Sequence, residues 1–495
     1  MRVYVYEHMQ NNEKKAPRVV MGIAAALLLG ARLPDGLGAQ ESPARTGAQA
    51  VAQTGVPDSS ALLTLADALR DAARHGFSNR IASGTSTADR ARARLPLKGI
   101  LPSARVESGV VRTTDPIGAF GTTLRQRLVT QAAFDPARLN NPAAITNVQG
   151  GLVLEVPLVN ADAWAGMRAA RATADASDAS ATWTARTTSA TVIRTFYGAV
   201  LAAEKVRTLL QAQRALDAAA RQVQAMLQQG LVTRADLLQA NVRATDVASQ
   251  LVAARNDVRT AEQQVALIMG RTDVAPLRLP SELPDSATVR ALAVRDTLVA
   301  AAPGGADERP DVRAARATVI AANADHRRAT ATLLPRINSF ARYDWNSPTA
   351  LYGGKPNWTV GVMASWSPFS GGSEMADIAV ATARRATALA GADATRAQAR
   401  LDADVARRDV IVALERLDLA GHAAEQSREA HRLVEKRYAG GLVTVAELLG
   451  AEATATGAAL AHAAARYALI EALAAHRLAN GTNPSDLATA LEGTH

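Results

Sequence analysis

The sequence has no cysteine among its 495 residues. Without thiols the chain has no disulfide framework, no thiolate metal site, no cysteine nucleophile and no cysteine-linked lipid anchor. Aromatic residues are also scarce, at 4% of the chain, whereas 48% of the residues are hydrophobic. Because that hydrophobic fraction is close to the globular average, the composition indicates a folded chain rather than a disordered one.

Long hydrophobic runs are absent after the first forty residues, and a membrane-spanning helix requires about 20 apolar residues. Near the start, a basic stretch over residues 14–18 precedes a shorter apolar run over 19–31, and small residues follow. This order is typical of a secretory signal peptide. We predict a signal peptide over 1–39 and a mature N-terminal segment over 40–59, so the mature chain is exported.

Lysine is rare, and the net charge of +9 comes almost wholly from arginines scattered among alanine and acidic residues. No basic run forms, so we expect solvated helix faces and no nucleic-acid partner. The motifs H-E-x-x-H, G-x-S-x-G and G-x-x-x-x-G-K-[ST] are missing, and the eight histidines are dispersed. We therefore expect no enzyme activity, no catalytic residues, no cofactor and no metal site.

An internal duplication organises the rest of the chain. The stretch from Gly230 to Leu238 returns, with two substitutions, from Gly441 to Leu449, 211 residues later. Because this offset is far longer than the 20–50 residues of solenoid repeats, each half is a large unit used twice. The same offset pairs Pro157 with Pro368, Arg255 with Arg466, and Gly270 with Gly481. The predicted domains are a first repeat over 60–273, a linker or equatorial region over 274–308, a second repeat over 309–484 and a C-terminal tail over 485–495.

Each half carries two segments in which apolar and polar residues alternate. Period-two alternation predicts strands with one apolar and one polar face, and it is also the pattern of transmembrane β-strands. The predicted strands cover 104–110, 152–158, 337–345 and 360–366, and the predicted cell-surface loops cover 114–149 and 346–357.

Seven of the 18 aromatic residues fall within residues 340–369. Aromatic belts at membrane interfaces gather tryptophan and tyrosine in this way. The alternative is an ordinary hairpin that uses aromatics as cross-strand pairs. The predicted girdle residues are Tyr343, Trp345, Trp358 and Trp366.

The long segments have heptad spacing, which predicts a left-handed coiled coil. A single helix is expected over 161–228, followed by a second helix after a turn at Gly230. His462 and His476 fall on seam positions, where they serve either as packing residues or as a pH switch. The seams are Leu237, Ala244, Leu251, Val258 and Val265; Ala240, Val247, Ala254, Ala261 and Ile268; and Ala451, Ala458, Ala465, Ala472 and Ala479.

The turns between paired helices carry the same capping signals. A glycine ends the first helix in a left-handed conformation, a threonine N-caps the next, and an acid at its third position completes a capping box. These residues are Gly230, Thr233 and Asp236 in the first turn and Gly441, Thr444 and Glu447 in the second.

Over almost all of its mature length, the chain resembles the TolC-type outer-membrane efflux channel family, because its motifs follow one another in the same order. The matching features are the opening over 63–69, Leu-Pro before the first strand of each half, Arg309-Pro-Asp311, the two Gly-Leu turns and the duplication. The resemblance implies a mostly α fold with a transmembrane β-barrel: a homotrimer with a 12-stranded barrel, four strands per chain, continued by a long α-helical coiled-coil periplasmic tunnel. It also implies an outer-membrane exit duct, with partners in a periplasmic adaptor, an inner-membrane pump of RND, ABC or MFS type, and outer-membrane lipid.

Strand number independently predicts oligomers. Four strands cannot close a barrel, for which about eight is the practical minimum. An open sheet edge in lipid would leave backbone groups unsatisfied, so several copies must share one wall.

The resemblance also implies roles for the turn residues. Val443 and Gly450 depart from the family, which has an arginine and a second acid there. The implied gate or pore constriction comprises Asp236, Tyr438 and Glu447, and Arg234 is the candidate for a lock that replaces the missing family residues. The expected adaptor-docking tips comprise Gly230, Leu231, Thr233, Gly441, Leu442 and Thr444. The alternative function is a non-channel periplasmic coiled-coil adaptor or scaffold, which would lack the four amphipathic strands.

Overall fold

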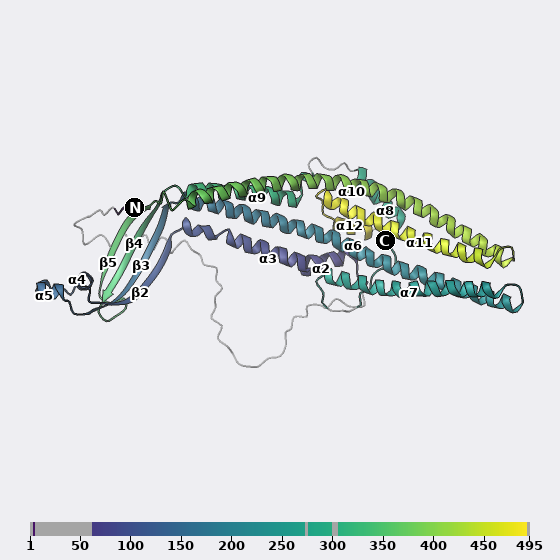
Figure 1. Cartoon of the computed structure of the whole chain (residues 1–495), viewed down its shortest axis with the longest axis horizontal. Coiled ribbons are helices and arrows are strands. Elements are labelled where there is room, and N and C mark those ends of the chain that lie inside the picture. The colour runs from purple at the N-terminus through teal and green to yellow at the C-terminus, as the bar shows by residue number, and fades with distance from the viewer. Residues whose placement is uncertain (1–2, 5–61, 273–275, 299–304, 493–495) are drawn as a thin grey trace, which may run out of the picture. The chain divides into compact units, whose positions relative to one another are not determined.

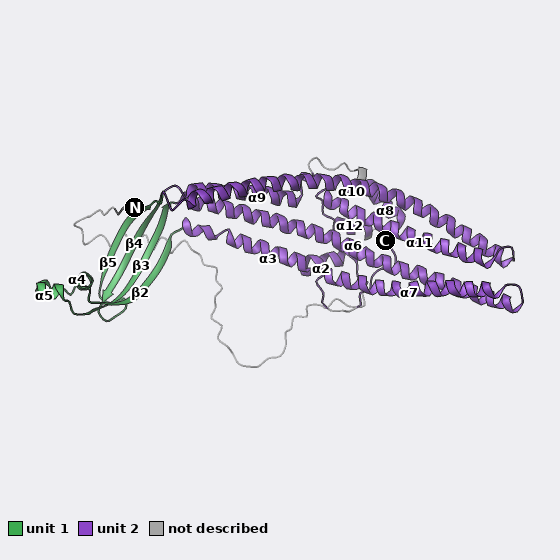
Figure 2. Ribbon diagram, viewed as in Figure 1, with its two compact units in different colours: residues 1–57, 101–159, 335–367 green, residues 58–100, 160–334, 368–495 purple. Residues whose placement is uncertain are grey.

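The computed structural model describes residues 3–4, 62–272, 276–298 and 305–492. It divides the chain into two compact units, one of strands and one of helices (Figure 2). The predicted signal peptide and N-terminal segment lie outside the described residues, apart from Val3 and Tyr4. Each predicted repeat contributes to both units, and the repeat bounds remain predictions. The strand unit takes residues 101–159 and 335–367, and the helical unit takes 58–100, 160–334 and 368–495.

The strand unit is built on one antiparallel sheet in the order β1-β5-β4-β3-β2 (Figure 1). The two-residue β1 pairs only with Met363 and Ala364 of β5. Along the rest of its length β5 has a free edge, and so does β2 at the other side of the described sheet. The strands are β1 (Val3–Tyr4), β2 (Ser103–Thr113), β3 (Ile145–Val159), β4 (Arg336–Ser347) and β5 (Lys355–Ser365).

The strand register separates apolar from polar residues. Directly opposed residues share a face, so Val106, Leu152 and Tyr343 lie side by side across three strands. The neighbouring positions, such as Arg105 and Arg342, point to the other face. One face is mostly apolar, with Arg112 at its end, and the other holds most of the charged and amide residues together with Val111, Val153, Phe340 and Met363. The apolar residues of the first face are Ala104, Val106, Val110, Val148, Leu152, Leu154, Val156, Ile337, Ala341, Tyr343, Trp345, Trp358, Val360 and Val362, and the polar residues of the second are Arg105, Glu107, Asn147, Gln149, Glu155, Asn338, Arg342, Asp344, Asn346, Asn357 and Thr359.

The sheet extends further toward its connections than the sequence pattern predicts. β3 starts at Ile145 rather than near 152, and the second connection shrinks to 348–354. Gly150 and Gly151 lie just before the strand predicted over 152–158, yet both glycines are paired with β2 and β4. The first connection also contains short helices, which are α4 (Pro116–Arg125), η2 (Gln131–Phe134) and α5 (Pro136–Asn140).

The helical unit is dominated by two long helical hairpins, α6–α7 and α10–α11 (Figure 1). The predicted helix over 161–228 is confirmed as α6 (Ala161–Gln228), which is roughly 100 Å long at about 1.5 Å per residue. A shift of 211 residues converts the bounds of α7 (Arg234–Ile268) into those of α11 (Val445–Ala479). The other elements are α2 (Leu65–His75), α3 (Phe77–Arg92), η1 (Leu95–Gly99), α8 (Ser286–Leu298), η3 (Ala306–Glu308), α9 (Pro310–Ala331), α10 (Ser373–Ala439) and α12 (Asp486–Glu492).

The predicted heptad seams face the hairpin partners. Every seam residue of α7 and α11 is buried or half-buried, as knobs-into-holes contacts require. Within the described part of the chain, no helix combines the length and the hydrophobicity needed to cross a membrane.

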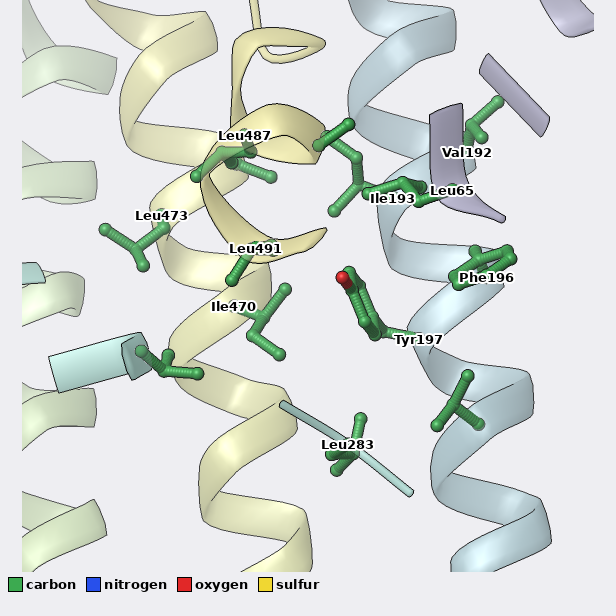
Figure 3. Packing of buried hydrophobic residues seen from close by; sticks show 14 of the residues in the cluster. Leu65, Val192, Ile193, Phe196, Tyr197, Leu283, Ile470, Leu473, Leu487 and Leu491 are labelled. Carbon is green, nitrogen blue, oxygen red and sulfur yellow. The ribbon is translucent and has the colours of Figure 1, made fainter. Parts of the chain in front are cut away.

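A core of leucine, isoleucine and aromatic residues lies where α6, α11, α2 and α8 meet (Figure 3). Two of its elements lie in segments predicted without a helix. α8 occupies the linker predicted over 274–308, and α12 occupies the tail predicted over 485–495. Leu487 and Leu491 of α12 are buried among side chains of α6 and α11, so this tail is part of the core.

Arg309 of the Arg-Pro-Asp motif is buried at the start of α9. Its guanidinium donates to Asp311 at 2.7 Å and to Asp402 of α10 at 3.0 Å. Its Cζ atom also lies 4.6 Å from the ring centroid of Trp183 on α6. The motif thus joins three helices through one fully paired charge, which is the condition for burying it.

His476 gives the helical unit a pH-dependent stability. Burial lowers the pKa of this imidazole, whose Nε2 lies 2.9 Å from Asn480 Nδ2. Arg477 and Arg407 lower the pKa further, whereas Asp296 raises it. Because the folded pKa lies below the unfolded value of about 6.5, the unfolded chain takes up the proton first as pH falls. Stability is therefore complete above about pH 6.5 and declines below it, by up to about 1.4 kcal/mol per unit of pKa displacement.

We expect a lower thermal unfolding midpoint at pH 5.5 than at pH 7.5, and a smaller difference in His476→Gln. The exposed His75 provides the control, since His75→Gln should leave the difference unchanged. An undiminished pH difference in His476→Gln would assign the effect to other groups, of which the half-buried His462 is the first to test.

Candidate functional site

The first candidate site is the pair of turns at the hairpin tips. Gly230 and Gly441 have φ values of +73° and +71°, so both adopt the predicted left-handed conformation. The N–H of Leu231 donates to the carbonyl of Met226, and the N–H of Leu442 donates to that of Arg437, each at 2.9 Å. These bonds, with those of the glycine N–H groups, form Schellman motifs. The motif fixes the turn and holds the leucine that follows each glycine.

The two turns differ in how their acids are used. Thr233 and Asp236 form the complete predicted capping box, with Thr233 N donating to Asp236 Oδ2 at 2.9 Å. The hydroxyl and the backbone N–H of Thr233 lower the pKa of Asp236. Thr444 accepts from the N–H of Glu447 at 3.2 Å, but no reciprocal bond from the Glu447 carboxylate to the cap backbone forms among the described residues. The exposed carboxylate of Glu447 is thus held only by the Thr444 hydroxyl, at 3.4 Å.

Tyr438 lies inside a small core that joins the two tips. Its hydroxyl donates to the sulfur of Met226 at 3.4 Å, which links α10 to α6. Burial raises the pKa of the Tyr438 phenol, and the nearby Asp236 carboxylate raises it further. The structure therefore brings together Asp236 and Tyr438, two of the predicted gate residues. The core consists of Leu216, Val223, Ala240, Tyr438, Val445, Leu448 and Leu449.

The remaining predicted tip residues face solvent. Leu231 is 66% exposed and Leu442 is 72% exposed, so neither belongs to a core of this chain. Thr233, Thr444 and Arg234 are exposed beside them. Arg234 and Glu447 form no ion pair with any residue in the described ranges, so the structure does not join them to Asp236 and Tyr438.

The two departures from the family have clear local consequences. Val443 is half-buried against the tip core, where it makes an apolar contact. Gly450 lies in α11 with open space around the position of a Cβ atom. The first departure therefore strengthens the tip core, and the second leaves room for a side chain. The sequence pattern missed the role of Val443 and the contact between Met226 and Tyr438.

The second candidate site is the sheet, whose polar face carries an ionic network. The Arg342 guanidinium donates to Asp344 at 2.8 Å and to Glu107 at 3.2 Å, so the network spans β2 to β4 across β3. Gly151 of β3 makes this possible, because a Cβ atom there would lie 2.6 Å from the Asp344 carboxylate. The paired charges and the amides beside them make this face suited to water.

The apolar face carries an aromatic cluster near the loop end of the sheet. Tyr343 and Trp345 contact edge to face, with ring centroids 4.8 Å apart, and Tyr352 meets Trp345 at 5.5 Å. Tyr352 lies over Gly150, where a Cβ atom would be 2.6 Å from its ring. Trp358 is directly opposite Tyr343. Of the predicted girdle residues, Trp366 lies just past β5, at the opposite end of the strands from Trp345.

Comparison with known proteins identifies the family. The family model described as Outer membrane efflux protein matches residues 119–271 and 306–482, which include most of both repeats. A comparison with curated proteins finds no match.

Solved structures share the fold at low sequence identity. The CmeC outer membrane channel of Campylobacter jejuni has a TM-score of 0.70 and 16% identity, covering 84% of this chain and 85% of its own. The outer membrane protein VceC of Vibrio cholerae has a TM-score of 0.69 and 18% identity, covering 85% and 96%. The MtrE outer membrane channel of Neisseria gonorrhoeae has a TM-score of 0.67 and 19% identity, covering 85% and 89%.

These similarities confirm the predicted fold class at the level of the chain, which is mostly α-helical and carries a four-stranded antiparallel sheet. Because the family match extends over well more than half of the chain, it carries more weight than any one structural neighbour. The chain belongs to the outer membrane efflux protein family.

Proposed function

We propose that this chain is one subunit of a trimeric outer-membrane duct through which an efflux or secretion system passes its substrates to the outside. The observation that carries the proposal is the sheet, with one apolar face, one charged face and free edges at β2 and β5. Such a sheet is stable in lipid only when copies close it into a barrel, because every backbone group must be paired there. A periplasmic scaffold has no use for this face, which disfavours the alternative function.

Conduction through the duct is passive. Its family and the similar structures are channels rather than enzymes, and the energy for export comes from the pump beneath. The ionic network of Arg342, Asp344 and Glu107 faces the water-filled lumen of the barrel. The aromatic cluster around Trp345 faces lipid near the membrane surface, where amphipathic rings are favoured. The helical unit forms the periplasmic tunnel.

Membrane fractionation followed by planar-bilayer conductance tests this function. We expect the protein in the outer membrane, extracted by detergent as a trimer, with discrete conductance steps after reconstitution. Recovery in the soluble periplasmic fraction, or a membrane protein that never conducts, would be incompatible with a duct.

The hairpin tips form the docking surface for a periplasmic adaptor that connects the duct to an inner-membrane pump. Leu231 and Leu442 support this role, because each is held out into solvent by a Schellman turn that fixes its backbone. A rigid apolar side chain loses little entropy on binding and fits the pocket of a partner.

Glu447 forms an acidic ring at the periplasmic entrance of the trimer. Its carboxylate is exposed and, unlike that of Asp236, is not tied to the cap backbone. Three such groups around one axis attract cations. Tyr438 keeps the tips closed through the shared tip core, the Asp236 carboxylate lies near its phenol, and Arg234 lies at the same entrance.

Glu447→Gln should therefore weaken the cation preference of the open channel and its block by multivalent cations. The amide keeps the Thr444 cap contact but removes three charges from the ring. Reversal potentials in a salt gradient measure the effect. Glu429→Gln is the control, because the exposed Glu429 carboxylate is already paired with Arg432 at 2.7 Å. Equal selectivity in Glu447→Gln and the parent protein would remove Glu447 from the gate.

A further inference from the structure

The duplication creates one helix contact that is made within the chain and a second, equivalent contact that is not. Within the chain, α6 of the first repeat packs against α11 of the second. The repeat equivalents of these helices are α10 and α7, because a shift of 211 residues relates them. Among the described residues, α10 and α7 have no comparable contact. Two helices with the sequence pattern of a packed pair are therefore left apart.

A buried ion pair marks the contact between α6 and α11. Glu204 of α6 and Arg466 of α11 are hydrogen-bonded through Oε1 and Nη2, and both side chains are almost inaccessible. The other carboxylate oxygen of Glu204 accepts the N–H of Leu283 at 3.0 Å. Burial of these charges is tolerated because each is paired.

The equivalent charges exist on the unpaired helices. Glu415 of α10 stands 211 residues after Glu204, and Arg255 of α7 stands 211 residues before Arg466. Both side chains are exposed, and neither forms an ion pair with any residue of the described ranges. The second repeat position of each charge therefore keeps the same residue type, but Glu415 and Arg255 do not pair within the chain.

Apolar residues around these charges show the same contrast. Val200 and Ala463, in the contact of α6 and α11, are 0% and 2% exposed. Their repeat equivalents Ile411 and Val252 are 40% and 68% exposed. These hydrophobic side chains occupy interface positions of the repeat but are uncovered in the single chain. They therefore indicate a surface that a second copy covers.

We propose that α10 of one subunit packs against α7 of the next in the trimer, and that Glu415 and Arg255 form an ion pair between subunits. The contact joins two different surfaces, so it is heterologous and closes into a ring rather than a two-fold dimer. It reproduces around the ring the contact that α6 and α11 make inside each chain. The inference rests on the proposed trimeric duct and assigns the residues that hold it together.

Cysteine cross-linking tests this contact directly, because the natural chain has no cysteine. In the double variant Arg255→Cys/Glu415→Cys, a thiol-specific cross-linker of about 8 Å replaces the two side chains, since a direct disulfide needs a shorter separation. We expect covalent dimers and trimers on denaturing gels. The control is Gln250→Cys/Glu415→Cys, because the repeat equivalent of Gln250, Ala461, is exposed in α11.

Size-exclusion chromatography of the same samples separates the possible failures. Trimers that cross-link no better than the control would overturn the assigned contact and leave the duct standing. Monomers in detergent would overturn both the contact and the duct. Cross-linking confined to single chains would place Arg255 and Glu415 together within one subunit, which also contradicts the proposal.

Charge reversal provides an independent test of the ion pair between subunits. Arg255→Glu and Glu415→Arg should each speed the dissociation of detergent-solubilised trimers at least about tenfold, from the low end of the coupling energies measured for close charge pairs across interfaces. The double reversal should recover most of the loss, since it restores opposite charges. Effects that simply add in the double variant would show that the two residues do not meet.

Discussion

Leu442→Asp should abolish export while leaving trimeric channels in the outer membrane. The leucine is 72% exposed and contributes to no core of this chain, so its loss costs the fold little. In the docked complex, however, a carboxylate would replace an apolar anchor and would have to be desolvated without a partner. A penalty of several kcal/mol weakens docking by two or more orders of magnitude, because about 1.4 kcal/mol corresponds to a factor of ten.

Dye accumulation in cells that lack other ducts measures the loss of export, and unheated denaturing gels measure the trimer. Leu128→Asp is the matched control, because Leu128 is also exposed but lies in the connection between β2 and β3. Full export by Leu442→Asp would refute the docking role of this tip. Loss of trimers in the same variant would instead make Leu442 part of the assembly.

Val110→Arg should weaken stable insertion, whereas Val111→Arg should not. The two valines are neighbours in β2, and both are exposed, at 68% and 48%. Val110 lies opposite Val148 on the apolar face, whereas Val111 lies opposite Asn147 on the polar face. Val110 lies two residues closer to the loop end than Ser108, whose row contains Trp345, so an arginine there would face lipid near the interface. Its cost there is up to about 1 kcal/mol, and every trimer carries three. The same arginine facing the lumen remains in water.

Outer-membrane yield and resistance of the trimer to heat measure the difference. Because the two variants have the same composition, a change in expression or in net charge affects both equally. Equal loss in both would indicate damage to the strand, and equal tolerance would contradict the assignment of the apolar face to lipid.

The sequence predicted the helices and their turns well because several local signals agree there. Gly230 ends α6, Thr233 caps α7, and Asp236 completes the capping box, so three independent features place one boundary. The duplication then repeats that agreement in the second half. The alternation of the strands likewise predicted the two faces of the sheet, because a period of two depends on no tertiary contact.

The failures have a common physical cause, which is that local signals oppose the tertiary structure. Glycine is unfavourable inside strands, and Gly150 and Gly151 precede the strand predicted over 152–158. Inside β3 they make room for the Tyr352 ring on one face and the Asp344 carboxylate on the other. α12 lies beyond the helix end at Gly481, in the segment predicted as a C-terminal tail, although Leu487 and Leu491 are buried in the core.

The partners of charged side chains could not be predicted at all. Arg309 belongs to the Arg-Pro-Asp motif, yet its bond to Asp402 joins residues 93 positions apart in sequence. The pairing of Glu204 with Arg466 is longer in range still. In both cases the sequence supplies the charges, and only the fold determines which ones meet.

The difference between the two capped acids bears on how the chain evolved. Aspartate at the first tip is short enough to reach back to the cap backbone, and its carboxylate is used up there. Glutamate at the second tip carries one more methylene, and its carboxylate stays accessible. An ancestral gene that doubled would have begun with two identical tips. Under the proposed gate, a difference of one methylene group then separates an acid that fixes the start of its helix from an acid that remains accessible to cations.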